Sequence, residues 1–533
     1  MFKNYFKTAF RNLSRQKQYS LLNILGLSLG MTCCLMILLY VKDERSFDKW
    51  LPDNNRIYRV AIDITSKNAD HLLFAPITGM ASQKLSEYSQ VEEATRILPP
   101  FAENIVVHYG TNDAYYESQV YWADVNVFNI FQYKFLSGNP ATALSTPNTL
   151  VITRNIAEKC FNTHADWSAP IGKILRLNDQ DFQVTAVIDN VPKNSIFRPE
   201  LIVSMAEFNN SNLITNWHAT VFQTFIKLKP GTDATAFEKK ISHFADRYVG
   251  DEIKKNSQDY RFFLQPITSI HLHSDLRNEL SKNNSASYIS IFMAAAIFLL
   301  LIACANFINM ATAMAKQRTK EVGVRKVIGA LRKQLIGQFL CESFLLSFTS
   351  LIVAYLILFL LLPLFNSIAM KELSAASLFV PNFIILSLSV MLGVTLLAGF
   401  YPALVLSNFN PVKSINSRFM GGNKSGQILR SGLVTAQFVI SISIIITTMV
   451  VSEQLSFLRQ QHLGFDKEQL LVIQAQGIEA IHTKYDVVRE ELMKNPAVIS
   501  VSVSGSVPGH RFGNNLVQLK GDHDKSADMK RSE

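Results

Sequence analysis

Long uncharged stretches dominate the hydrophobic pattern of this chain. Five of them contain no Asp, Glu, Lys or Arg, and they cover residues 18–41, 283–315, 343–370, 373–412 and 431–452. A helix needs about 20 apolar residues to cross the hydrocarbon core of a bilayer. The pattern therefore predicts five membrane spans, at residues 19–41, 286–314, 338–365, 382–406 and 431–452.

The long segment 42–282, between the first two predicted spans, has a different pattern. Polar and apolar residues alternate in NRIYRVAIDI (55–64) and VEEATRIL (91–98), as they do in half-buried strands. The residues between these runs, 76–89, follow a helical period, and a later region with NIVVHYG and DFQVTAVIDNV is rich in β-forming and turn residues. We expect an α+β domain with a β-rich insert.

Charge orients these segments. Residues 1–18, 315–334 and 407–430 hold 16 of the 52 Lys and Arg residues and one acid, within a chain of 533 residues with net charge +10. Because loops rich in Lys and Arg stay cytoplasmic, we expect an amphipathic cytoplasmic segment at 1–18, a cytoplasmic loop at 407–430 and an extracytoplasmic domain at 42–282. The positive charge is explained by topology, so no nucleic-acid partner is expected.

The last segment, 453–533, starts with the same order of elements as the outer domain. A polar exit helix, a strand, a helix and a strand follow one another, and the Ser-Phe pair at 46–47 recurs at 456–457. Such repetition indicates an internal duplication. We expect the start of a second, incomplete extracytoplasmic domain. A chain fragment and a degenerate second half both fit, and the fragment is the favoured interpretation.

The basic run RTKEVGVRKVIGALRKQL (318–335) is predicted to form one amphipathic helix along the inner membrane surface. Its apolar stripe consists of Val324, Ile328, Leu331, Leu335 and Phe339. Anchoring to anionic lipid would explain the charge. It would not explain Gly323 and Gly329, since each glycine costs up to about 1 kcal/mol in a helix. A protein that docks closely on the segment would explain the glycines.

Residues 317–346, QRTKEVGVRKVIGALRKQLIGQFLCESFLL, resemble the signature loop and third span of the FtsX-like, MacB-type permeases of ABC transporters. Residues 11–40 are similar to the first span of the bacterial two-repeat branch of that family, and 399–415 to its fourth-span exit. The resemblance implies a polytopic α-helical membrane protein with an extracytoplasmic MacB-like core domain at 42–282, porter-like with a β-rich insert. Two-repeat members continue through a second outer domain and three more spans, so the resemblance also implies a C-terminally truncated chain.

The same resemblance implies that residues 315–337 are a cytoplasmic coupling helix that docks on a separate ATPase. Its implied ATPase contacts are Glu321, Val322, Gly323, Val324, Arg325, Lys326, Gly329 and Ala330.

Within the spans, a few small or polar residues are candidates for helix packing. Gly26 and Gly30 form a GxxxG motif, and Asn306 and Asn309 should face other helices because amides are costly in lipid. Glu342 is either a buried partner for a base of the coupling region or a side chain that reaches out to the interface.

No catalytic, cofactor or metal site is expected. The string GGNKSG at 421 has the wrong order for a phosphate-binding loop, and HExxH, CxxC and GxSxG motifs are missing from the sequence. His271 and His273 fall in a strand-like run, and two histidines without a third ligand are more often structural. The chain is therefore not expected to be an enzyme.

These features together predict a multi-pass permease subunit of a bacterial inner membrane, with a cytoplasmic N-terminus. Expected partners are a separate ABC ATPase, an identical or related permease subunit, membrane lipids and a periplasmic adaptor. By mechanotransmission, ATP hydrolysis would drive substrate export or release outside. The alternative is an FtsX-like signalling or scaffold protein that regulates an outer partner, such as a cell-wall hydrolase, without moving cargo.

Overall fold

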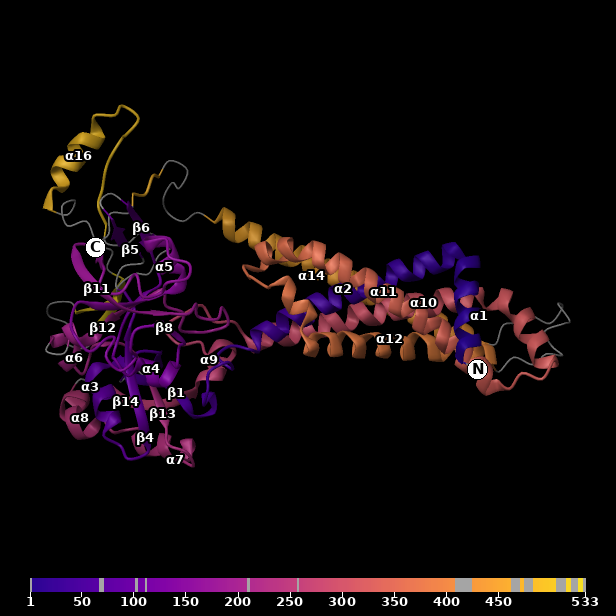
Figure 1. Cartoon of the computed structure of the whole chain (residues 1–533), viewed down its shortest axis with the longest axis horizontal. Helices are drawn as coiled ribbons and strands as arrows, with labels where there is room; N and C mark the ends of the chain where they lie inside the picture. The colour runs from indigo at the N-terminus through magenta and orange to yellow at the C-terminus, as the bar shows by residue number, and fades with distance from the viewer. Residues whose placement is uncertain are drawn as a thin grey trace.

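The computed structural model is an elongated molecule with a sheet-rich domain at one end of a bundle of long helices (Figure 1). The described residues are 2–66, 71–100, 104–110, 113–208, 211–255, 258–407, 424–461, 470–473, 483–504, 514–518 and 526–530.

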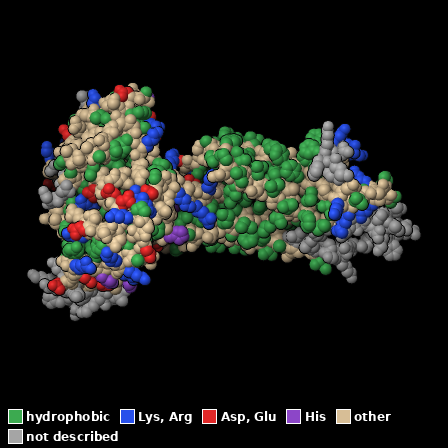
Figure 2. All heavy atoms as spheres, turned by 60° about the horizontal axis from the view of Figure 1, so that its bottom comes forward, with side chains coloured by type: hydrophobic (Ala, Val, Ile, Leu, Met, Phe, Trp, Pro, Cys, Tyr) green, Lys and Arg blue, Asp and Glu red, His purple; other side chains and the backbone are tan. Residues whose placement is uncertain are grey.

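Five helices in the described part of the chain are long and apolar enough to cross a membrane. They are α2 (Lys17–Glu44), α10 (Ala286–Val327), α11 (Arg332–Ala369), α12 (Pro381–Ser407) and α14 (Lys424–Gln460). Each predicted span lies on one of these helices. A hydrophobic belt surrounds the bundle, and Lys and Arg gather at the end away from the sheet (Figure 2). Together with the sheet-rich domain, these helices confirm the predicted fold class.

Four of the long helices, α2, α10, α11 and α12, share one buried core. Leu27, Met31 and Leu35 of α2 pack there with Ala354 of α11 and Phe383 of α12. The helix α1 (Phe2–Arg15) lies against α11 and α2. By contrast, α14 lies along the outside next to α10, and none of its most apolar window is buried.

One sheet of 14 strands organises the outer domain. Its strands are β1 (Ile57–Ser66), β2 (His71–Phe74), β3 (Ile77–Thr78), β4 (Val91–Leu98), β5 (Ile105–Tyr109), β6 (Asp113–Glu117), β7 (Val120–Ala123), β8 (Phe135–Ser137), β9 (Thr149–Thr153), β10 (Ile174–Leu177), β11 (Gln180–Ile188), β12 (Leu201–Ser204), β13 (Thr220–Leu228) and β14 (Gln258–Pro266). The main path runs β14-β1-β13-β4-β7-β12-β9-β11-β10-β5-β6, with β2, β3 and β8 paired to β1, β13 and β11.

The sheet has two parts. In the first, β14, β1, β13 and β4 are antiparallel, and helices pack on them through Leu85, Phe237 and Phe244. The second part runs from β5 to β12 and includes the parallel pairs β7–β12 and β9–β11. It is inserted in the chain between β4 and β13, as predicted for the β-rich insert. The short helices are α3 (Gly79–Ser86), α4 (Val127–Phe131), α5 (Arg154–Phe161), α6 (Asn212–Thr215), α7 (Ala234–Ile241), α8 (Asp246–Lys255) and α9 (Ile267–His273), with η1 (Asn54–Arg56), η2 (Met205–Phe208) and η3 (Ala375–Phe379).

Entry and exit of the outer domain lie side by side. The chain arrives from α2 into β1 and leaves by β14, and these strands pair with Tyr58 opposite Pro266. This pairing brings both connections to the membrane bundle to the same edge of the sheet. The helix α9 follows β14 at that edge.

Two expectations for local structure are wrong. The run with His271 and His273 forms α9 instead of a strand, because Ile267, Ile270 and His271 are buried at helical spacing. In the tail, α16 (Tyr485–Met493) matches a predicted helix, but 470–473 and 497–504 form no strand. These stretches lie apart from the sheet, so no neighbouring strand satisfies their backbone groups. The tail ends in the hairpin β15 (Asn514–Gln518) and β16 (Ser526–Lys530).

Candidate functional site

The predicted inner helix is a corner between two helices. Gly329, just beyond the end of α10, has φ +97°, its N–H donates to Lys326 O at 3.0 Å, and the N–H of Ala330 donates to Arg325 O at 2.9 Å. These bonds form a Schellman motif, a common way to end a helix on a glycine. The expectation of one continuous helix is therefore wrong, since Gly329 adopts a left-handed conformation that favours glycine.

The second helix starts just after the corner. The N–H of Leu331 donates to the side-chain oxygen of Gln334 at 3.0 Å, which satisfies one of the free donors at the start of α11. Both sides of the turn are thus held by local hydrogen bonds. The corner is a defined structure.

The corner divides the predicted apolar stripe. Leu335 and Phe339 are buried, whereas Val324, Ile328 and Leu331 are 59, 80 and 66% exposed. Exposed apolar side chains next to bases, at the end of a bundle, are typical of a contact surface. We call Val324, Ile328 and Leu331 the corner tip.

The other predicted ATPase contacts are not equivalent. Val322 is 4% exposed and packs with Leu335, Phe339 and Ala403, so its side chain supports the corner from inside and is not available to a partner in this arrangement. Gly323, Arg325, Lys326 and Ala330 are half-buried and lie around the corner tip. The side chain of Glu321 lies outside the described part.

A chain of polar side chains joins the two helices behind the corner. The guanidinium of Arg325 donates to Oε1 of Gln338, and Nε2 of Gln338 donates to Oε1 of Glu342 at 3.3 Å. Gln338 and Glu342 are 7 and 4% exposed. Glu342 is therefore linked to a base of the predicted coupling region, and the alternative in which it reaches the interface is wrong.

The GxxxG motif brings α2 close to α10. A Cβ at Gly30 would lie 2.5 Å from Cβ of Ala303, and one at Gly26 would lie 3.2 Å from Nδ2 of Asn306. Asn306 is nevertheless exposed in this single chain. Oδ1 of Asn309 is buried and has no hydrogen-bond partner among the described residues. The expectation that both amides face other helices is thus wrong for Asn306 within this chain.

A second polar cluster, the outer joint, lies where the bundle meets the sheet domain. Its centre is the carboxylate of Glu44, which is 2% exposed at the end of α2. This carboxylate contacts His271 Nε2 at 2.7 Å and Lys371 Nζ at 2.6 Å, and it accepts from Asn284 Nδ2 at 2.9 Å. These groups come from α9, the turn after α11 and the residue pair preceding α10. One carboxylate therefore ties together four segments of the chain.

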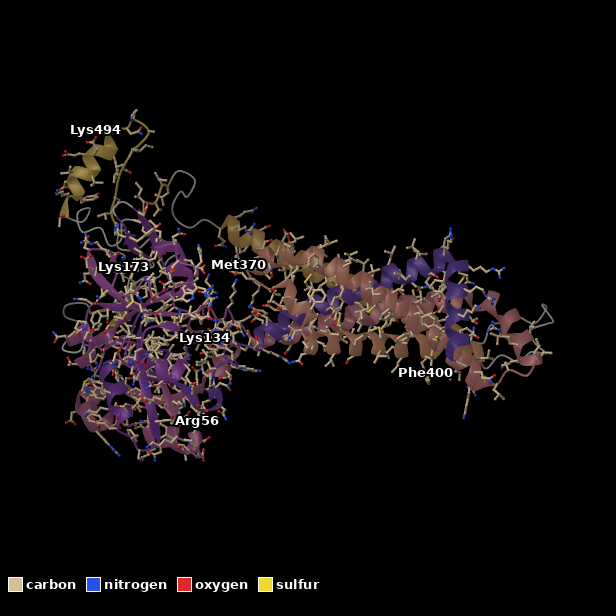
Figure 3. The ribbon with its side chains drawn as sticks, viewed as in Figure 1. Arg56, Lys134, Lys173, Met370, Phe400 and Lys494 are labelled. Atoms are coloured by element: carbon tan, nitrogen blue, oxygen red, sulfur yellow. The ribbon has the colours of Figure 1, made fainter. Side chains whose placement is uncertain are left out.

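Neighbouring contacts reinforce the outer joint. The ring of Phe47 stacks on that of His271 with centroids 3.4 Å apart, and Lys371 Nζ lies 2.9 Å from Asp43 Oδ2. Burial lowers the pKa of Lys371, but hydrogen bonds to Glu44 and Asp43 outweigh it and raise that pKa overall. Met370, labelled at the outer end of the bundle in Figure 3, precedes Lys371 at φ +50°.

Sequence reasoning missed the outer joint. A structural role was expected for His271, and its contact with Glu44 is such a role. The usable signals were two acids at the end of the first span and one lysine in the short loop between the third and fourth spans. Their meeting depends on the order in which the helices pack.

Known protein families match most of this architecture. Residues 20–244 match the MacB-like periplasmic core domain, and residues 293–411 match the FtsX-like permease C-terminal domain. The second match includes the whole corner and the helices on both sides of it.

Individual relatives are distant. The macrolide export ATP-binding/permease protein MacB of Campylobacter jejuni is 21% identical over 249 residues, which are 46% of this chain and 35% of that protein. The pyoverdine export ATP-binding/permease protein PvdT of Pseudomonas savastanoi is 24% identical over 281 residues, 51% of this chain and 39% of that protein. The chain thus spans well under half the length of these two relatives.

The periplasmic region of MacB from Actinobacillus actinomycetemcomitans is a similar solved structure. It has a TM-score of 0.29 and 15% identity, covering 39% of this chain and 90% of that one. The two family matches and the five apolar helices define a membrane protein with an extracytoplasmic domain. The chain belongs to the FtsX-like, MacB-type family of ABC transporter permeases.

Proposed function

We propose that this chain is the permease subunit of an ABC transporter and couples ATP hydrolysis by a separate ATPase to substrate export or release on the outer side. The observation that supports this most is the corner between α10 and α11. It presents exposed apolar side chains at one end of a helix pair whose other end reaches the outer domain.

The corner tip is the proposed contact for the ATPase. Apolar side chains such as Ile328 would be buried by a partner, and the surrounding bases would add complementarity to acidic residues. Gly323, Arg325, Lys326, Gly329 and Ala330 shape this surface. Glu321 is part of the proposed contact through its position in the sequence.

Motion of the corner would travel along rigid helices. The helix α10 has 42 residues, so at the usual helical rise it is about 60 Å long. At the corner, the chain Arg325, Gln338 and Glu342 holds α10 and α11 together. At the far end, the outer joint connects α11 and the start of α10 to α2 and to α9 of the outer domain. Movement of the pair would therefore reach the domain.

The proposed setting is a bacterial inner membrane with the N-terminus in the cytoplasm, as the charge distribution favours. The proposed assembly contains a second identical or related permease subunit, and a periplasmic adaptor is a further proposed partner. Asn306, exposed in an apolar span, supports a second subunit because an amide facing lipid is costly.

The test is capture of the tagged chain from its host and measurement of ATP hydrolysis in lipid nanodiscs. We expect an ATPase to co-purify and Ile328→Asp to remove it, with normal membrane insertion. Ile499→Asp is the matched control, because Ile499 is 85% exposed on the tail and Ile328 is 80% exposed. Retention of the ATPase by Ile328→Asp would contradict the proposal. Cargo-stimulated ATP turnover would distinguish a transporter from an FtsX-like scaffold, which would keep the ATPase without such stimulation.

A further inference from the structure

A cavity of about 370 Å³ lies in the outer domain, far from both the corner and the outer joint. It opens where α3, β4, the β7–α4 loop, the loop before β9 and η2 meet, so both parts of the sheet contribute to it. Its lining residues are Ser82, Gln83, Ser86, Ala94, Arg96, Asp124, Val125, Asn126, Leu144, Ser145, Met205 and Ala206. Concave sites of this size between structural units often bind small molecules.

Arg96 is the cation in the cavity wall. Its side chain is 6% exposed, and Asp124 holds it from one side through Nε to Oδ2 at 2.9 Å and Nη2 to Oδ1 at 2.7 Å. The remaining nitrogen, Nη1, is buried and has no hydrogen-bond partner among the described residues. A donor left in this state costs free energy that a suitable acceptor would recover.

Asn126 provides the opposite group. Its Nδ2 donates to Ala94 O at 2.5 Å and to Glu93 Oε2 at 3.3 Å, which fixes the orientation of the amide. Its Oδ1 is buried and, within the part of the chain that the structure describes, accepts no hydrogen bond. The same cavity is thus lined by two residues with unsatisfied groups, one a donor and one an acceptor.

The charge of the lining decides which ligand fits. Arg96 is neutralised by Asp124, and no other Lys, Arg, Asp or Glu lines the cavity. An anion would therefore gain little from electrostatic attraction. A neutral amide group has an acceptor and a donor, which complement Nη1 of Arg96 and Oδ1 of Asn126. Leu144 and Met205 offer apolar contacts for a small side chain next to that amide.

We infer that this cavity binds a small neutral ligand that carries an amide group. Full binding requires the walls to move slightly, because both unsatisfied atoms are shielded from solvent in the empty cavity. The inference goes beyond ATPase coupling and does not depend on it.

The probe is N-acetyl-L-alanine methylamide, a small neutral diamide, and binding is measured by saturation-transfer difference NMR on the full chain in nanodiscs. We expect saturable binding to the unmodified protein. Asn126→Leu should weaken it roughly tenfold, since one hydrogen bond is lost. Gln83→Trp should abolish it, because Gln83 is exposed on α3 at the cavity and an indole there would cover the entrance.

The control is Ala236→Trp, an exposed position on α7 that does not line the cavity, which should bind as the unmodified protein does. If Asn126→Leu fails to fold, Gln83→Trp still provides the test at an exposed site. The inference is overturned by equal binding in Gln83→Trp and the control, by no saturable signal, or by acetate binding where the diamide does not. Because ATPase capture is a separate measurement, failure here leaves the proposed function standing.

Discussion

Arg325, in the last turn of α10, donates a hydrogen bond to Gln338, which lies 13 residues later on α11. Gln338 in turn donates to Glu342, so its side chain bridges a half-buried cation and a buried acid across the corner. A bridging amide of this kind fixes the relative position of the two helices more firmly than packing alone.

Replacement of Gln338 by Met should weaken the corner. Methionine has a similar length but neither accepts from Arg325 nor donates to Glu342, and we expect a loss of about 1–3 kcal/mol in stability. ATP hydrolysis should continue while its stimulation by the permease falls. The measurements are thermal denaturation and ATPase assays in nanodiscs. Ser389→Ala on the exposed face of α12 is the control, and equal stimulation in both variants would show that the bridge has no role in coupling.

Gly329 allows a second test of the corner, because only its backbone conformation is at issue. A Cβ there would meet no atom within 4 Å, so Gly329→Ala adds strain at φ +97° without a clash. We expect destabilisation of about 1–2 kcal/mol and reduced coupling. Gly393→Ala is the matched control, since its added Cβ also meets nothing but its φ is not in the left-handed range. Identical melting and coupling of the two variants would contradict this role for Gly329.

The sequence predicted large parts of this structure because the signals were local. Uncharged length marked the spans, and period-two runs marked β1 and β4. The end of α10 was missed because residues 324–335 keep a helical apolar period across Gly329. A period cannot reveal that one glycine takes a left-handed φ and turns the chain.

The candidate site divides in the same way. Arg325 and Glu342 were identified as a possible pair, but the bridging by Gln338 depends on the geometry of the corner. Glu44, His271 and Lys371 are 100 to more than 200 residues apart in sequence and meet only when the sheet domain returns to the end of α2. Contacts of that range have no signature in a single sequence.

Lys371 should be essential to the outer joint. Lys371→Met removes two contacts with acids and leaves Glu44 buried with fewer donors, at a cost of about 1–3 kcal/mol. We expect the ATPase to remain bound while cargo export or release is lost, because the break lies beyond the corner. Lys494→Met is the control, since its pair with Glu491 is exposed and contributes little. Normal export with Lys371→Met would exclude the outer joint from transmission.

Asp48 links the start of the outer domain to its insert. It is fully buried at φ +56°, and it accepts from Ser195 Oγ at 2.7 Å and from the N–H of Ile196 at 3.2 Å. Burial raises the pKa of Asp48 to about 7, although these two hydrogen bonds act in the opposite direction. The folded protein therefore keeps a proton on Asp48 at pH values where the unfolded chain has lost it.

The contribution of Asp48 to stability should decrease as pH rises from about 4 to about 7 and stay constant above that range, a total on the order of 4 kcal/mol. Asp48→Asn removes this titration and suits the backbone, because asparagine tolerates a left-handed φ. We expect the melting temperature of Asp48→Asn, relative to the unmodified protein, to increase between pH 5 and pH 8. Asp113→Asn, at an exposed strand position, should show no such trend. A constant difference across this pH range would mean that Asp48 is ionised in the folded protein.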